Sequence, residues 1–121
     1  MIRGVRGATT IENNNEKEII EQTEILIREM ISSNNIIVND ISHIIITTTD
    51  DITATFPARA VRNIDGYKYV PVMCMKELSV DNGLPLCIRV MMTINTSKQQ
   101  EEIVHVYKNN AITLRPDLSN D

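Results

Sequence analysis

The run at positions 86–94, Leu-Cys-Ile-Arg-Val-Met-Met-Thr-Ile, constrains the fold more than any other part of the chain. It is rich in β-branched residues and contains no Gly or Pro, so it predicts a long strand. Because side chains alternate between the two faces of a strand, one face is wholly apolar and the other is mixed. The mixed face carries Arg89, whose guanidinium stays protonated and is costly to bury alone. Arg89 therefore needs an anionic partner, either a side chain or a ligand.

The length and composition of the chain predict one globular domain. It has 121 residues, of which 42% are hydrophobic, enough for a real core. It contains no apolar stretch of about 18 residues, and its start lacks the apolar region of a signal peptide, so no membrane partner is expected. Cys74 and Cys87 show neither metal spacing nor a disulfide framework. We expect a cytoplasmic protein with free thiols and no bound metal.

The distribution of charge points to a small ligand. The net charge is −4, which argues against nucleic acid as a partner. Several arginines nevertheless lie in apolar or Gly-rich surroundings, whereas the acidic residues lie mostly in polar segments. A locally positive pocket on an acidic protein suggests a small anionic ligand.

The hydrophobic pattern predicts an α+β fold with a mixed, mostly antiparallel sheet and helices on one face. Pro71 lies within one expected strand and indicates an edge or an irregular backbone there. Ser97 and Gln100 fit a capping box at the start of a helix. Because the second face of the sheet is half polar, we expect another subunit to cover it. The expected elements are strands at 2–9, 43–49, 67–75, 86–94 and 111–114, a long helix at 16–33, a short helix at 58–64 and a helix of about ten residues after Ser97.

Inspection of motifs excludes several chemistries. The sequence has no phosphate-binding loop, no dinucleotide fingerprint and no Gly-x-Ser-x-Gly nucleophile motif. The two cysteines have no neighbouring His in sequence, and buried inert thiols are the better interpretation. The remaining groups are arginines, Glu77 and a tyrosine, which suit electrostatic stabilisation of charge. Glu77 follows a predicted strand and is either a structural partner of Arg89 or a polar group of a site.

Blocks of sequence along essentially the whole chain resemble the small monofunctional chorismate mutases, of the trimeric pseudo-α/β-barrel type found in Bacillus and its relatives. The blocks occur in the order and at the spacing of that family. They lie at positions 3–10 (RGVRGATT), 56–62 (FPARAVR), 69–72 (YVPV), 74–75 (CM), 87–93 (CIRVMMT), 105–107 (HVY) and 114–118 (LRPDL).

The resemblance implies an activity and an assembly. The family rearranges chorismate to prephenate within one molecule, on the route to phenylalanine and tyrosine, and needs no cofactor. Three subunits pack their sheets into a barrel-like core, with an active site at each subunit interface. We expect residues 1–115 to form a single catalytic domain, and the polar residues 116–121 to form a mobile tail that folds over the mouth of the site.

The same resemblance implies a role for each matching residue. Arg89 contacts the breaking ether oxygen, and Glu77 lies near the ring hydroxyl and the developing positive ring. The other implied substrate-binding residues are Arg6 and Tyr107 at a carboxylate, Cys74 at the ring hydroxyl, Phe56 as an aromatic wall, Arg62 and Arg115 at the mouth, Leu114, and finally Arg59 and Met73, which stand where lysine and threonine are frequent in the family.

Two other interpretations compete with this one. A trimeric module of the same architecture would bind a metabolite carboxylate as a sensor without catalysis. Alternatively, Arg89 and Glu77 form a buried pair that fixes the register of the fold. On the residues alone, the prediction is a small-anion site between subunits.

Overall fold

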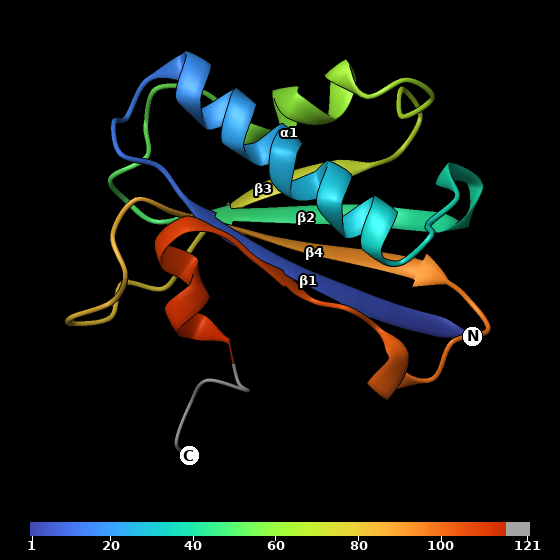
Figure 1. Cartoon of the computed structure of the whole chain (residues 1–121). Helices are drawn as coiled ribbons and strands as arrows, with labels where there is room; N and C mark the ends of the chain where they lie inside the picture. The colour runs from blue at the N-terminus through green and yellow to red at the C-terminus, as the bar shows by residue number, and fades with distance from the viewer. Residues whose placement is uncertain (116–121) are drawn as a thin grey trace.

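The computed structural model describes residues 1–115, and its elements form one sheet with helices packed against it (Figure 1). The two longest strands and the long helix were predicted to within about one residue. The elements in chain order are β1 (Ile2–Thr10), α1 (Glu16–Ser33), η1 (Val38–Asp40), β2 (Ile41–Thr48), η2 (Pro57–Asn63), β3 (Val72–Lys76), β4 (Cys87–Asn95), η3 (Gln100–Glu102), β5 (Val106–Tyr107) and η4 (Asn109–Leu114), where η marks a 3₁₀ helix.

The sheet has five strands in the order β3-β2-β4-β1-β5. The long strand β4 lies at its centre and pairs antiparallel with β1 on one side and with β2 on the other. The two edge strands, β3 and β5, pair in parallel with their neighbours. The sheet is therefore mixed, as expected for this α+β fold, with antiparallel ladders at the centre and parallel ladders at the edges.

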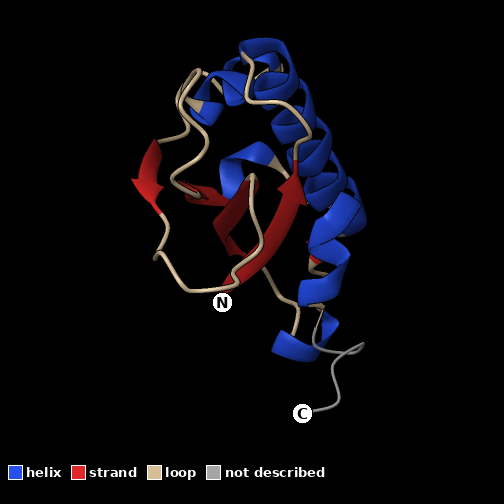
Figure 2. Cartoon of the chain, turned by 90° about the vertical axis from the view of Figure 1, so that its left-hand side faces the viewer, coloured by secondary structure: helices blue, strands red, loops and turns tan. Residues whose placement is uncertain are grey.

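The helix α1 covers one face of the sheet, as Figures 1 and 2 show. Asn15 caps its first turn by accepting a 2.8 Å hydrogen bond from the backbone N–H of Glu18. Its apolar stripe packs on the buried side chains of β4, so the wholly apolar face of that strand forms the core. The buried members of the stripe are Ile19, Thr23, Leu26, Ile27 and Met30.

Gly7 allows this helix to approach β1 closely. A Cβ atom at this position would lie 2.4 Å from the Sδ atom of Met30. A side chain here would force Met30 to move, so packing between helix and sheet explains the glycine.

Two of the predicted strands begin later in the structure than expected. The segment 67–71 forms turns, in which the N–H of Val70 donates to the carbonyl of Tyr67, so the third strand begins only at Val72. Pro71 cannot donate, but its carbonyl accepts from the N–H of Ile44 and starts the ladder. The central strand begins at Cys87, because Leu86 has a left-handed conformation with φ of 49°.

The expected helix after Ser97 is wrong. Only the single turn of η3 forms, and its capping box joins Gln99 and Glu102 in place of Ser97 and Gln100. The buried side chain of Asn34 then binds both the N–H and the carbonyl of Val104, each at 2.8 Å. These two bonds hold the chain extended, and it continues into β5 beside β1.

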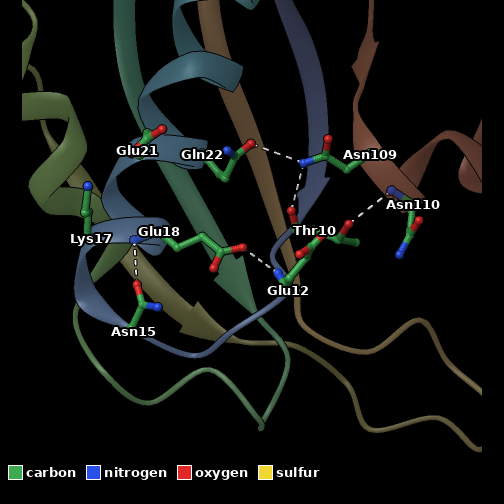
Figure 3. A pocket seen from close by; sticks show the side chains of 9 residues that line it. All are labelled: Thr10, Glu12, Asn15, Lys17, Glu18, Glu21, Gln22, Asn109 and Asn110. Atoms are coloured by element: carbon green, nitrogen blue, oxygen red, sulfur yellow. Dashed lines mark hydrogen bonds between the residues drawn. The ribbon is translucent and has the colours of Figure 1, made fainter.

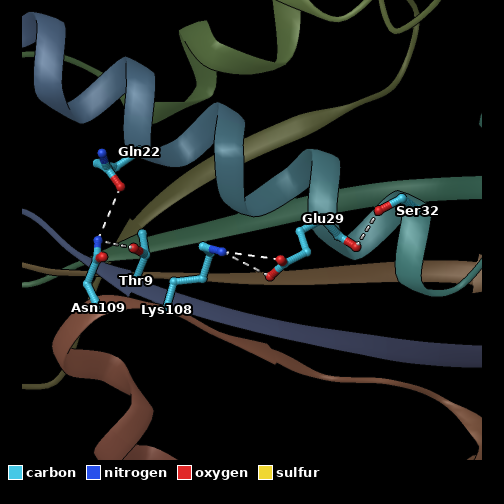
Figure 4. A network of polar contacts seen from close by, with 6 residues as sticks. All are labelled: Thr9, Gln22, Glu29, Ser32, Lys108 and Asn109. Carbon is cyan, nitrogen blue, oxygen red and sulfur yellow. Dashed lines mark hydrogen bonds and ion pairs between the residues drawn. The ribbon is translucent and has the colours of Figure 1, made fainter.

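The expected last strand at 111–114 is also wrong, because this segment belongs to η4. Asn109 opens the turn with φ of 54°, and its side-chain amide donates to the hydroxyl of Thr9 and the side chain of Gln22. Next to it, Lys108 forms an ion pair with Glu29 of α1 (Figure 4). These contacts fold the segment back onto β1 and α1. The tail predicted at 116–121 lies outside the described residues.

The face of the sheet opposite α1 is left open by the described residues. Methionine side chains dominate its apolar part: Met73 is 60% exposed, Met75 44% and Met91 41%. Patches of this kind on a small protein commonly mark contact surfaces. No helix within residues 1–115 is long and apolar enough to cross a membrane.

Candidate active site

Arg89 and Glu77 lie together on the open face of the sheet. Arg89 projects from near the start of β4, and Glu77 follows the end of β3, where its N–H donates to the carbonyl of Thr48 at 2.8 Å. The Nε atom of Arg89 lies 3.4 Å from Oε2 of Glu77. The same carboxylate oxygen accepts a 2.8 Å hydrogen bond from the hydroxyl of Thr47 on β2. The sequence left open whether Glu77 is a structural partner of Arg89 or a polar group of a site, and the structure places its carboxylate beside Arg89.

The side chain of Arg89 is only half-buried in the single chain. Its side chain is 48% exposed, and that of Glu77 is 25% exposed. The reason is that no helix within residues 1–115 covers this part of the face, so the guanidinium reaches solvent beside its partner. Arg89 therefore keeps donors that a ligand or another subunit can use.

A hollow of about 480 Å³ adjoins the Arg89–Glu77 pair. Most of its wall comes from the loop between β3 and β4. Its lining residues are Thr49, Asp50, Asp51, Glu77, Leu78, Ser79, Val80, Gly83, Leu84, Pro85, Cys87 and Arg89. A pair locked against solvent would have no such space, so the geometry leaves room for a small molecule at these charges.

Two aspartates hold the loop that walls this hollow. Asp50 accepts a 2.7 Å hydrogen bond from the hydroxyl of Ser79 and pairs with Lys76. The Ser79 bond, and then the Lys76 charge, lower the pKa of the Asp50 carboxyl. Asp51 accepts from the N–H of Leu86 at 2.9 Å and so supports its left-handed backbone. These contacts fix where β4 begins, two residues before Arg89.

Arg6 lies on the same open face as Arg89. It pairs with Met91 on β4, so Arg6 and Arg89 are diagonal neighbours on adjacent strands. The backbone N–H of Arg6 donates to Nδ1 of His105 at 3.0 Å, which fixes the tautomer of that ring. Partial burial, and then the Arg6 charge, lower the pKa of His105.

Tyr107 and Arg115 line a second hollow of about 500 Å³ at the β5 edge, together with Glu29, Ser33 and residues 104–106. Both side chains are half-buried. Leu114, the last residue of η4, is half-buried as well. The structure thus brings Tyr107 and Arg115 together, at the opposite edge of the sheet from β3.

The predicted residues of η2 form a third group. Phe56, directly before this 3₁₀ helix, is 70% exposed, which is unusual for the one phenylalanine of the chain. Arg59 forms an ion pair with Glu16 of α1 and donates to the hydroxyl of Thr55. Arg62 is exposed at the other end of η2. This group is separate from the Arg89–Glu77 pair within one chain.

Met73 and Cys74 lie next to each other on β3 but on opposite faces. Met73 is in register with Ile45 and points to the open face, whereas Cys74 packs on the core beside η2. Burial raises the pKa of the Cys74 thiol, and a hydrogen bond with the backbone of Ala58 opposes this shift. Burial likewise raises the pKa of Cys87, against the nearby charge of Arg89. Both are free thiols, as predicted.

A larger polar hollow of about 580 Å³ lies elsewhere, between the start of α1 and the start of η4 (Figure 3). Its lining contains Glu12, Glu18 and Glu21 but Lys17 as its only basic residue. The hollow beside Arg89 also holds three acids, Asp50, Asp51 and Glu77, but two of them are bonded within its own wall, to the hydroxyl of Ser79 and the N–H of Leu86. Because Arg6 is the diagonal neighbour of Arg89, two guanidinium-bearing residues lie on this face, and this hollow is the better candidate for an anionic ligand, although it is smaller.

Sequence reasoning missed Thr47, Asp50 and Asp51. Thr47 is in register with Arg89 on the neighbouring strand, and this register is set by the pairing of β2 with β4. The polar Thr-Thr-Thr-Asp-Asp run at 47–51 was the available signal, since polar side chains at a strand end commonly line sites. Among residues 1–115 no three His, Cys, Asp or Glu side chains are placed to hold a metal ion.

The fold and the site define a small α+β protein that presents arginines and one glutamate, groups suited to stabilising charge, at a hollow of small-molecule size. A family model described as Chorismate mutase type I matches residues 2–118. The chain belongs to this family, and it is accordingly an isomerase of the chorismate mutase class. The resemblance found in the sequence is confirmed.

Individual relatives agree with this assignment over nearly the whole chain. Chorismate mutase AroH of Bacillus subtilis (strain 168) is 48% identical over 98% of this chain and 94% of its own length. Chorismate mutase AroH of Thermus thermophilus is 40% identical over 98% of this chain and 97% of its own length. A solved chorismate mutase from Clostridium thermocellum has a TM-score of 0.89 and 44% identity, and the match covers 92% of this chain and 98% of that chain.

Proposed function

We propose that the protein rearranges chorismate to prephenate at the hollow beside Arg89 and Glu77, by stabilising separated charge. The observation that carries this proposal is the placement of a half-exposed guanidinium and a carboxylate side by side at a hollow of small-molecule size. The product feeds the synthesis of phenylalanine and tyrosine. No bound cofactor takes part.

The chemistry of the rearrangement fits these two groups. In the transition state the ether C–O bond breaks ahead of C–C bond formation, so negative charge grows on the oxygen and positive charge grows on the ring. Arg89 stabilises the oxygen and Glu77 stabilises the ring, both more strongly than in the ground state. Since no proton moves, the site needs no general base.

The enzyme must also hold the compact diaxial conformer of the dianion. We assign this positioning to Arg6 and Tyr107 at a carboxylate, with Phe56 as the aromatic wall. The outer contacts that we propose are Arg59, Arg62, Met73, Cys74, Leu114 and Arg115. Two features limit these roles in the single chain: Arg59 already pairs with Glu16, and Met73 offers no hydroxyl.

We further propose that three copies assemble through the open face of the sheet into a pseudo-α/β barrel. The half-exposed Met73, Met75 and Met91 support this, because an apolar patch opposite α1 is uncovered in one chain. Partial cover by another subunit would also desolvate Arg89 and strengthen its action on charge.

The assembly would also complete the site. Arg89 and Glu77 lie on the open face, whereas Phe56 and Arg62 lie around η2 beside the β3 edge. We propose that the η2 group of one subunit meets the Arg89 group of its neighbour, so that each interface holds one site. Two free thiols fit a cytoplasmic location.

Loss of the ultraviolet absorbance of chorismate on adding the protein tests the activity, with prephenate identified as the product. A mixing experiment tests the shared site. We expect subunits with Arg89→Ala and subunits with Phe56→Ala and Arg62→Ala each to be defective alone. Co-expressed, they would recover activity, because a mixed trimer regains an intact site. No recovery in mixed trimers would overturn the shared site while leaving the activity itself intact.

A further inference from the structure

The hydroxyl of Thr47 makes the shortest contact to the carboxylate of Glu77. Its Oγ1 donates to Oε2 at 2.8 Å, whereas Nε of Arg89 lies 3.4 Å from the same oxygen. A distance of 3.4 Å is beyond the usual range of about 2.7–3.2 Å for an N–H···O hydrogen bond. The ion pair is therefore loose, and the hydroxyl determines where the carboxylate lies.

The other carboxylate oxygen of Glu77 is left available. No described residue makes a hydrogen bond or ion pair to Oε1. The backbone of Glu77 is fixed by its N–H bond to the carbonyl of Thr48, but the side chain has several rotatable bonds beyond it. Holding such a side chain in one rotamer needs a dedicated contact, because ordering it costs entropy.

We propose that Thr47 is a positioning residue for the rearrangement, and this rests on the proposed role of Glu77. The hydroxyl of Thr47 holds Oε2 of Glu77 in place. The other carboxylate oxygen, Oε1, then points toward the hollow, and the guanidinium donors of Arg89 stay available to the substrate. Without the hydroxyl, the carboxylate is free to turn onto Arg89 and close the ion pair. That closed pair competes with the ether oxygen for Arg89 and withdraws the negative charge from the ring.

The variant Thr47→Val tests this, because valine keeps the branched shape that suits β2 but cannot donate. We expect kcat to fall about tenfold, the scale of one hydrogen bond to a charged group, with KM changed by less than about twofold. Thr47→Ser restores the donor and should recover most of kcat. Thr47→Ala serves as a second hydroxyl-free variant if the valine protein folds poorly.

Thr48→Val is the matched control. Thr48 is the next residue of the same strand and faces the other side of the sheet, in register with Ile88. Its side-chain hydroxyl makes no hydrogen bond to the described residues, and its carbonyl bond to Glu77 survives the substitution. We expect kcat of this variant to stay within about twofold of the wild type.

A double-mutant cycle separates Thr47 from the role of Glu77 itself. In the Glu77→Ala background, Thr47→Val should have no further effect on kcat, because the group that it positions is gone. An equal tenfold loss in both backgrounds would overturn the proposal, as would wild-type kcat for folded Thr47→Val. Near-normal activity of Glu77→Ala alone would instead refute the proposed role of Glu77.

Discussion

Tyr107 and Arg89 lie in one cross-strand row of the sheet, with only Ala8 between them. Ala8 is in register with Tyr107 on the parallel side of β1 and with Arg89 on its antiparallel side. Tyr107 and Arg89, which follow Ala8 in the sequence by 99 and 81 positions, are thus joined through a single strand. The row links the edge that carries Tyr107 to the centre that carries the charged pair.

Replacing Arg89 by Ala or Lys should lower turnover by at least about 10²–10³, the scale for removing one donor to a developing oxyanion. The fold should survive, because the side chain is half exposed. Arg28→Ala is a suitable control, since Arg28 is an arginine of similar exposure that pairs with Glu24 on α1. Near-normal conversion of chorismate by the Arg89 variants would refute the proposed role of this residue.

Glu77→Gln distinguishes catalysis from a structural pair. The pair is partly exposed and loose, so losing its charge should change the free energy of unfolding by less than about 1 kcal/mol. Activity should nevertheless fall at least about tenfold, because the ring cation loses its counter-charge. Urea unfolding and the chorismate assay are compared with Glu24→Gln, a matched glutamate–arginine pair on α1. A large loss of stability with activity kept would favour the register-fixing interpretation.

The sequence predicted the central strand and its mixed face better than it predicted the contacts made from that strand. Two-residue alternation in 86–94 placed Arg89 on the less apolar face, and the family resemblance implied a role for Glu77, but neither indicated that Thr47 holds the carboxylate. That contact depends on the pairing of β2 with β3, in which Thr47 is in register with Met75, two residues before Glu77. Local patterns do not encode such pairings.

The C-terminal third of the chain also shows that local patterns miss contacts between distant segments. The Ser97 capping signal and the apolar residues that follow predicted a helix, but the side chain of Asn34 binds both backbone groups of Val104 and keeps the chain extended. The expected strand at 111–114 gives way to η4 because Asn109 anchors it to β1 and α1. In both places an asparagine side chain makes contacts between segments far apart in the sequence, and these contacts override local propensity.

Met91→Glu should break the proposed trimer. Met91 is 41% exposed on the open face, so the charge is tolerated by a single chain but would be buried at a subunit interface. Light scattering after size exclusion should show three copies for the wild type and a smaller species for the variant, with activity lost. Ile25→Glu is the matched control, because Ile25 has the same 41% exposure on α1 and should leave the trimer intact. An unchanged mass for Met91→Glu would contradict assembly through this face.

Stability should depend on pH through His105. Burial, and then the Arg6 charge, lower its folded-state pKa below the unfolded value of about 6.5, so the unfolded chain binds more protons between these two values. The free energy of unfolding should therefore be constant above about pH 6.5 and fall as the pH is lowered through that window. Protonation also removes the acceptor for the N–H of Arg6. Urea unfolding from pH 7.5 to 5 checks this, and His105→Gln should show a weaker dependence; an identical slope would contradict the assignment.

The two thiols should resist alkylation in the folded protein. Burial raises the pKa of both Cys74 and Cys87 and so lowers the fraction of reactive thiolate at neutral pH. Cys87 is only 3% exposed and should react more slowly than the half-buried Cys74. Mass spectrometry after timed iodoacetamide treatment at pH 7.5 should show both reacting far more slowly than in urea, with Cys74→Ser and Cys87→Ser assigning each site.

If Cys74 contacts the substrate as proposed, chorismate should slow its modification further, and modification should reduce activity. Rapid labelling of Cys87 in the native protein would contradict the packing described for the start of β4.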